Sequence, residues 1–293
     1  MVRHPNLLKA LSLAAMIALP AIGHAVEYRL GIFAGSASRE SQAELKATFE
    51  PLASYIAKAS GANVRIEISQ SFRNMDRRVK SGRYAILLSA TQFTADSIEK
   101  GYEPVAKWDK PLYGVFVAPV DKPYKRIADL KGQRVGIVGR EIVTGPLCLN
   151  ALNKGGLRAD KDLAYVYEGE FQDVMSRQLM ENMLDAACLG PGPWKALNEQ
   201  APGKFKVLAE TIKVPGFAFS IDGDLSPQEK GKLKAILVGI GKTPEGKRAL
   251  AAIRGSAVGA TDTEPTSAKE YADARQVLVD NKKLYDAQIP KQK

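Results

Sequence analysis

Hydroxyl and glycine residues gather at three places where a predicted strand ends and a predicted helix begins. They are Gly35, Ser36 and Ser38 at the first place, Ser89 and Thr91 at the second, and Thr144 and Gly145 at the third. The first N–H groups of a helix have no partner within the helix, so such a turn can hold an oxyanion with help from nearby hydroxyls. The alternative at each place is helix capping without a ligand. We interpret the three turns as candidate ligand-binding turns.

Four larger side chains extend this candidate set. Arg39 could bind an anionic group through two parallel hydrogen bonds, or it could extend into solvent. Tyr113 begins a predicted strand and could stack on a solute or hydrogen-bond to it, while Phe72 and Phe171 could form apolar walls. Aromatic residues serve more often as core, and that alternative stays open.

Glu168 and Glu170 form a pair of carboxylates of the kind that general acid–base catalysis uses. Gly169 between them indicates a turn, and no nucleophile is evident nearby. Both histidines of the chain, His4 and His24, lie in its first 25 residues, which read as an export signal. The mature chain would therefore lack Ser–His and Cys–His pairs. We expect Glu170 to hydrogen-bond to a polar or cationic part of a ligand, and we expect neither an enzyme nor a cofactor.

Residues 1–25 resemble a cleavable export signal. A basic start is followed by an apolar stretch over 7–22 and a small-x-small cleavage site that ends at Ala25. The apolar stretch is too short and too interrupted to span a membrane. We expect cleavage after Ala25 and a periplasmic mature protein.

The charge balance is basic. The formal charge of +10 falls to +8 after cleavage, because Arg3 and Lys9 are the only Lys, Arg, Asp or Glu residues in the signal. Such an excess can steer anions toward a cleft, although interleaved acids favour ordinary solvated helix faces. The chain has no arginine–aromatic array typical of nucleic-acid binding and no zinc-ligand spacing.

Two cysteines, Cys148 and Cys188, remain in the mature chain. An even number of cysteines in an oxidising compartment permits a disulfide. The alternative is two small buried residues, one in a helix and one in a strand, because pairing requires a close approach of the two Cα atoms.

Alternating strands and helices occur twice along the chain. Strands at 28–33, 64–68 and 84–88 alternate with helices at 41–60 and 72–81, and strands at 133–138, 163–167 and 185–189 alternate with helices at 145–155 and 171–183. Such alternation predicts two α/β lobes, each a mostly parallel sheet flanked by helices. Ligands bind beyond the carboxyl ends of the strands in such sheets, so we expect a cleft between the lobes.

Local signals set the limits of several helices. Ser41 with Glu44, Ser226 with Glu229, and Ser267 with Glu270 have the spacing of capping boxes. Pro51 either kinks the helix 41–60 or begins a second helix. A long helical stretch is expected from 226 to about 254, and a last helix from 267.

The lobes are discontinuous in sequence. Strands at 102–107 and 113–119 flank the first crossing, and strands at 205–212 and 217–221 flank the return. We predict a first lobe of 26–112 plus 217–293 and a second lobe of 113–216, joined by two crossing strands that act as a hinge.

With these elements in place, the chain resembles the periplasmic solute-binding subunits of phosphate, phosphite and phosphonate ABC transporters. The resemblance rests on ELKATFEPLASYIAKASG, on the aromatic-led hinge strand after YEPVAKW, and on the helix–strand join IADLKGQRVGIV, and it covers nearly the whole mature chain. It implies the two-lobed type II periplasmic binding protein fold, or Venus flytrap, and a monomer that delivers a small polar solute to an inner-membrane permease.

The resemblance also implies positions for the ligand. The family's hydroxyl-rich turn at the start of the first helix of lobe two corresponds to Val143, Thr144 and Gly145, and its Ser-His pair corresponds to Glu170 and Phe171. A carboxylate in place of a hydroxyl would repel a phosphonate. The resemblance nevertheless implies an oxyanion such as a phosphonate or phosphate-like solute, or a carboxylate compound. A sensor subunit that contacts a membrane signalling protein is the alternative, and an enzyme on the same fold is less favoured.

Overall fold

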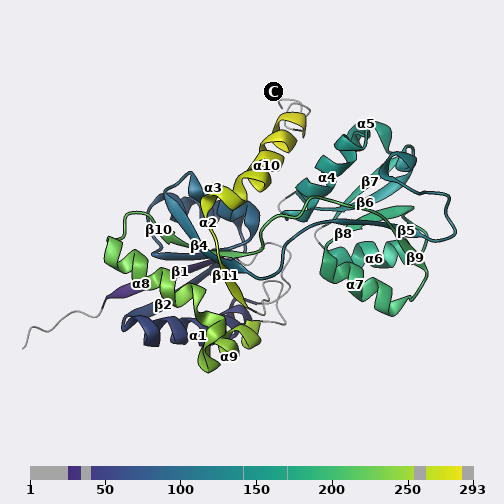
Figure 1. Cartoon of the computed structure of the whole chain (residues 1–293). Helices are drawn as coiled ribbons and strands as arrows, with labels where there is room; N and C mark the ends of the chain where they lie inside the picture. Colours follow the sequence, from purple (N-terminus) through teal and green to yellow (C-terminus); the bar gives the residue numbers. More distant parts are fainter. Residues whose placement is uncertain (1–25, 34–40, 141, 170, 254–261, 286–293) are drawn as a thin grey trace, which may run out of the picture.

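The computed structural model describes residues 26–33, 41–140, 142–169, 171–253 and 262–285. The proposed export signal, residues 1–25, lies outside the described residues. Two sheets, each covered by helices, stand side by side and are linked by two extended segments (Figure 1). Among the described helices, none combines the length and hydrophobicity needed to cross a bilayer.

The first sheet has six strands in the order β11-β4-β10-β3-β1-β2. The strands are β1 (Glu27–Phe33), β2 (Asn63–Ser69), β3 (Ile86–Ser89), β4 (Tyr102–Trp108), β10 (Ala218–Asp222) and β11 (Thr263–Pro265). β1 pairs in parallel with β2 and β3, whereas β10 runs antiparallel to both β3 and β4, and β11 antiparallel to β4.

The second sheet has five strands in the order β7-β6-β8-β5-β9. They are β5 (Val115–Pro119), β6 (Arg134–Val138), β7 (Tyr165–Gly169), β8 (Ala186–Leu189) and β9 (Phe205–Glu210). β6 pairs in parallel with β7 and β8, and β5 runs antiparallel to β8 and β9. Both sheets are thus mixed, because the strands next to the two crossings run against their neighbours. The α/β architecture predicted from the sequence is confirmed.

Helices cover both faces of the first sheet. α1 (Gln42–Ser60), α8 (Pro227–Val238) and α9 (Pro244–Ile253) pack on one face through a large apolar cluster. α2 (Phe72–Lys80) and α3 (Thr91–Ile98) cover the other face. The apolar face of α1 consists of Leu45, Phe49, Leu52 and Ile56, and all four are fully buried.

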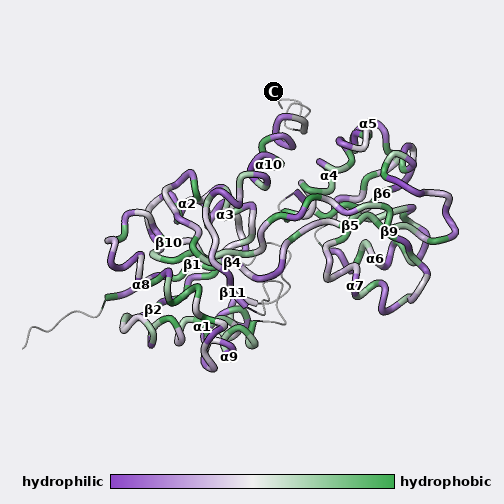
Figure 2. Tube along the Cα trace, in the orientation of Figure 1, coloured by the Kyte–Doolittle hydropathy of each residue, from purple (hydrophilic) through white to green (hydrophobic). Residues whose placement is uncertain are grey.

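The second sheet is covered in the same way. α4 (Thr144–Lys154) and the short α5 (Ala159–Asp162) lie on one face, together with the turn η1 (Ile127–Leu130). α6 (Gln172–Met180) and α7 (Pro191–Gln200) lie on the other face. Hydrophobic segments concentrate along the strands, and hydrophilic ones along the outer turns (Figure 2).

Cys148 of α4 and Cys188 of β8 form a disulfide, with their Cα atoms 6.1 Å apart. Both cysteines are fully buried. The bond ties α4 to the sheet beneath it, so the pairing that the sequence left open is present in the structure.

Most predicted elements are present, and two capping boxes, Ser41 with Glu44 and Ser226 with Glu229, are confirmed. The third predicted capping box, Ser267 with Glu270, was wrong, because the Ser267 side chain forms no cap hydrogen bond. Instead, the Ser267 backbone carbonyl accepts a hydrogen bond from the Glu270 N–H in the short turn η3 (Ala268–Tyr271). The long helix expected to 254 was also wrong: α8 ends before Gly239, the turn η2 (Ile240–Lys242) follows, and α9 starts at Pro244. Pro51 lies inside the single helix α1.

The last helix, α10 (Ala272–Tyr285), contacts both halves of the molecule (Figure 1). Tyr271, Ala95 and Ala218 form a small cluster where η3 and α3 meet. Further along, Ala274 and Val277 of α10 pack with Leu147 of α4. The amide of Asn281 donates a 2.8 Å hydrogen bond to the carbonyl oxygen of Pro146 in the first turn of α4.

Candidate functional site

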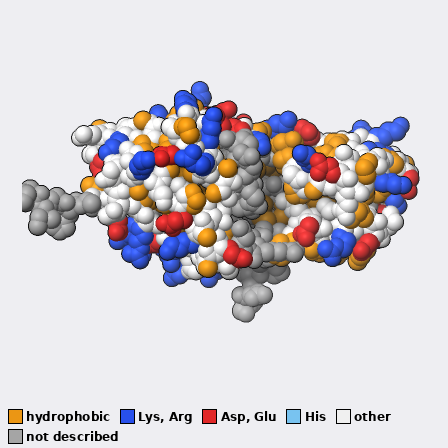
Figure 3. Space-filling view, turned by 90° about the horizontal axis from the view of Figure 1, so that it is seen from below, with side chains coloured by type: hydrophobic (Ala, Val, Ile, Leu, Met, Phe, Trp, Pro, Cys, Tyr) orange, Lys and Arg blue, Asp and Glu red, His pale blue; other side chains and the backbone are white. Residues whose placement is uncertain are grey.

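Four strands lead at their carboxyl ends into helices whose first turns have no side-chain cap. α3 follows β3, α4 follows β6, α6 follows β7 and α7 follows β8, and none of the four has a side chain bonded at its N-cap. In contrast, serines cap α1, α2 and α8. In the space-filling view a hollow with hydrophobic side chains on its rim lies on the inner side of the second half (Figure 3).

Thr144 at the start of α4 offers two unused donors. The residue is 4% exposed. Within the described residues, neither its backbone N–H nor its hydroxyl has a hydrogen-bond partner. Buried polar groups are nearly always paired, so this residue is the strongest candidate for contact with a bound anion.

Gly145 is required for packing. A Cβ at this position would lie 2.4 Å from the carbonyl oxygen of Val138 and 2.6 Å from that of Gly139. Its N–H donates to the carbonyl of Ile142 at 2.8 Å. Pro146 has no N–H, so Thr144 carries the free donors of this turn. Gly145 thus brings α4 close to the end of β6 and sets where Thr144 lies.

The hydroxyls of Ser89 and Thr91 are bonded within the protein. Both residues are fully buried. Ser89 Oγ lies 2.9 Å from Thr94 Oγ1, and Thr91 Oγ1 donates to the carbonyl of Pro215 in the second crossing segment. These side chains therefore hold the fold together, and only backbone groups of this turn would remain for a ligand.

The aromatic candidates of the second half are partly buried. Tyr113 packs at the edge of the cluster that contains Val115 and Met175, and the Nζ atom of Lys213 lies 4.7 Å from the centre of its ring. Phe171 occupies the N-cap position of α6 and is half-buried.

The remaining candidates cannot be placed. Gly35, Ser36, Ser38, Arg39 and Glu170 lie outside the described residues, as does the side chain of Phe72. Their assignment stays a prediction.

α7 is poorly suited to bind an anion. Pro191 and Pro193 remove two donors from its first turn. The N–H of Gly190 is already bonded, at 2.6 Å, to the side-chain oxygen of Gln172 in α6. Gln172 thus links the starts of α6 and α7.

Arg140 was missed by the sequence analysis. It lies two residues after the end of β6, and its guanidinium forms a 3.0 Å ion pair with Glu168 at the end of β7. Both side chains are partly exposed, at 43% and 38%. The position of this arginine, two residues after a buried strand, is the sequence feature that could have identified it as a site residue. The ion pair brings the Arg140 guanidinium to the carboxyl end of the second sheet, four residues before Thr144.

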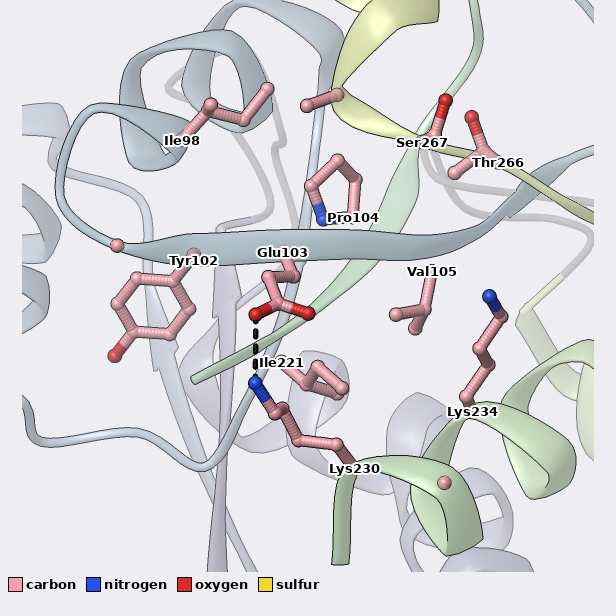
Figure 4. Close-up of a pocket in the computed structure, with 13 residues that line it drawn as sticks. Ile98, Tyr102, Glu103, Pro104, Val105, Ile221, Lys230, Lys234, Thr266 and Ser267 are labelled. Carbon is pink, nitrogen blue, oxygen red and sulfur yellow. Dashed lines mark hydrogen bonds and ion pairs between the residues drawn. The ribbon is translucent and has the colours of Figure 1, made fainter. Parts of the chain in front are cut away.

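Two other hollows lie away from these helix starts. One of about 490 Å³ lies on the first half, between β4, α8 and η3 (Figure 4). Its floor is largely apolar, and Lys230 already pairs with Glu103 across it at 2.9 Å. The other, of about 400 Å³, lies along the crossing segments, where Lys107 pairs with Glu270. Lys230 and Lys107 are thus paired with carboxylates, and Lys234 is the further cation that lines the first hollow. In the described part of the chain, neither hollow offers a buried residue with two free donors as Thr144 does.

Residues 34–271 match the family model described as ABC transporter, phosphonate, periplasmic substrate-binding protein. The matched range covers most of the chain.

Solved structures share the fold at low sequence identity. A binding protein component of an ABC phosphonate transporter from Pseudomonas aeruginosa superposes with a TM-score of 0.64 and 16% identity, covering 90% of this chain and 89% of that one. A Xanthomonas citri protein bound to ATP gives 0.70 and 16%, covering 87% and 99%. PhnD1 from Prochlorococcus marinus in complex with methylphosphonate gives 0.68 and 14%, covering 88% and 98%. At these identities the likeness concerns the fold alone.

Proposed function

Because the chain belongs to the family of periplasmic substrate-binding proteins of ABC phosphonate transporters, we propose that it captures a small oxyanion between two lobes. Membership makes it the periplasmic, solute-binding component of such a transporter, and its partners are a small molecule and a membrane permease. We propose that the first lobe consists of residues 26–112 and 217–293 and that the second lobe consists of residues 113–216. The ligand favours the closed form in proportion to its extra contacts there.

The observation that carries the proposal is Thr144. Its N–H and hydroxyl lack partners in the described part of the chain and lie at the positive end of the α4 dipole. An oxyanion would satisfy both donors at once. Gly35, Ser36, Ser38 and Arg39 would supply donors from the first lobe.

We propose a phosphonate-like or carboxylate solute. Tyr113, Phe171 and Phe72 would enclose its apolar part, and backbone groups near Ser89 and Thr91 would complete the anion contacts. Glu170 would select against a doubly charged phosphonate or bind a cationic group of the solute. The chain would act as a monomer without turnover, after removal of the signal behind Ala25.

The first test replaces Thr144 by valine. Loss of a hydroxyl hydrogen bond to a charged ligand should weaken binding about twentyfold, while the melting temperature of the ligand-free protein stays unchanged. Isothermal titration with methylphosphonate, phosphate and acetate as probes measures the affinity. Thr48→Val in α1, a half-buried threonine remote from α4, is the matched control. Unchanged affinity for every probe that binds the wild type would remove Thr144 from the site.

The second test concerns the positive charge of Arg140. Because the side chain is partly exposed, Arg140→Gln should slow anion association about fivefold at low salt and flatten its dependence on ionic strength. Stopped-flow measurements with the probe that binds the wild type give the rate. Arg126→Gln, whose side chain is 78% exposed and pairs with the nearby Asp129, is the control for net charge. Equal slowing in both variants would show that only net charge matters.

A further inference from the structure

We propose that Gly114 and the Cys148–Cys188 disulfide lock the crossing strands to α4, which confines hinge bending to residues 112–113 and 212–214. Gly114 is then a positioning residue for the binding site. This inference rests on the proposed function only in so far as α4 contacts the ligand.

Gly114 lies directly against the disulfide. A Cβ at this position would be 2.7 Å from Cys188 Sγ and 2.8 Å from Cys148 Sγ. Real Cβ atoms essentially never approach so closely, and a disulfide that joins a helix to a strand cannot swing aside as a flexible side chain can. Only glycine lets the first crossing segment rest on the two sulfurs.

Thr211 joins the second crossing segment to the first at Gly114, next to the disulfide. Its N–H donates to the carbonyl of Gly114 at 2.9 Å, and its hydroxyl accepts from the Gly114 N–H at 2.8 Å. Thr211 is buried, and its Cγ2 would be 3.0 Å from the same added Cβ. The first crossing segment is therefore fixed to the second half from residue 114 onward, and the second crossing segment is fixed to it up to residue 211.

The opposite ends of the crossings are fixed to the first half. Thr91 donates to the carbonyl of Pro215, and the hydroxyl of Tyr271 donates to that of Gly216 at 3.4 Å. Burial raises the pKa of Tyr271, so its hydroxyl stays protonated and keeps donating. A Cβ on Gly216 would lie 2.4 Å from the carbonyl oxygen of Lys110, so these two segments also touch.

A short stretch remains between the two locks. Leu112 and Val214 form an isolated bridge with two 2.9 Å hydrogen bonds, and no other strand pairs with them among the described residues. Hinges are a few residues that absorb the change in φ and ψ between rigid bodies. Residues 112–113 and 212–214 have that position.

The lock reaches the ligand-binding turn through α4. Cys148 lies about one helical turn after Thr144, and Cys188 lies two residues before Gly190, where α7 begins. A shift of the disulfide would therefore move the free donors of Thr144 relative to the hinge.

The test is a rescue experiment. Gly114→Ala and Gly216→Ala are each made in the wild type and in the Cys148→Ala, Cys188→Ala background. Gly216 is the matched control, because it is a crowded glycine of the second crossing segment whose neighbour is a carbonyl and not the disulfide. Melting temperature, hydrogen exchange at the amides of Gly114 and Thr211, and affinity for methylphosphonate are measured.

In the wild type, Gly114→Ala should lower the melting temperature by about 5 °C, speed exchange at both amides and weaken methylphosphonate binding about fivefold. Removal of the sulfurs should abolish these losses for Gly114→Ala and leave those of Gly216→Ala unchanged. If Gly114→Ala does not accumulate, recovery of folded protein in the cysteine-free background is the supporting result.

Equal losses for Gly114→Ala in both backgrounds, or equal rescue of Gly216→Ala, would overturn the lock. A purely structural glycine would lower the melting temperature without changing affinity, and that result would also overturn the positioning role. If the wild type does not bind methylphosphonate, that ligand fails, while the melting and exchange comparison still decides whether the lock exists.

Discussion

Replacement of both Cys148 and Cys188 by alanine should lower the free energy of unfolding by about 4 kcal/mol. The disulfide spans 40 residues of sequence, and a loop of this size removes that much conformational entropy from the unfolded chain. Both sulfurs are fully buried between α4 and the second sheet, so their loss also removes packing. Urea denaturation followed by circular dichroism measures the change.

The matched comparison is the wild type under reducing conditions, which should lose stability by a similar amount. Thiol titration of denatured, unreduced wild type should find no free thiol. Two reactive thiols per chain, or a double variant within about 1 kcal/mol of the wild type, would contradict the expectation.

Gly145→Ala should destabilise the protein by about 3 kcal/mol and reduce anion binding about a hundredfold in whatever fraction folds. The new methyl carbon would lie 2.4 Å from one carbonyl oxygen and 2.6 Å from another, and both belong to the backbone at the end of β6. Relief requires α4 to move away from the sheet. Because Thr144 directly precedes this residue, its donors would move too.

Gly192→Ala serves as control for this variant. Gly192 lies in the first turn of α7, and nothing lies within 4 Å of an added Cβ. Chemical denaturation and isothermal titration with the probe that binds the wild type should show a large effect at Gly145 and almost none at Gly192. Equal, small effects would mean that α4 tolerates the shift and that Gly145 does not position the turn.

The fold was largely predictable because its signals are local. Capping boxes at Ser41 and Ser226 and apolar strands such as 86–89 depend on neighbours within a few residues. α7 was missed because Pro191, Gly192 and Pro193 read as a turn, although proline fits the first turn of a helix. The break at Gly239 depends on how α8 and α9 pack on the sheet, which no local pattern shows.

The site was less predictable because its chemistry depends on distant partners. Thr91 and Thr144 look alike in sequence, yet Thr91 bonds to Pro215, 124 residues away, while Thr144 has no partner within the described residues. The crowding of Gly114 by two sulfurs arises only when α4 and β8 meet. Sequence patterns identified the turns, and tertiary contacts decide which hydroxyls remain available.

The position of β10 has a consequence for how the chain matures. β10 lies between β3 and β4, but it comes from residues 218–222, so the first sheet stays incomplete until that late segment arrives. The second sheet uses only residues 115–210, and this range, which includes α4, contains both cysteines. If the polypeptide emerges amino end first, all strands of the second sheet are present before β10 arrives. We expect the second half to fold and to form its disulfide before the first sheet is complete.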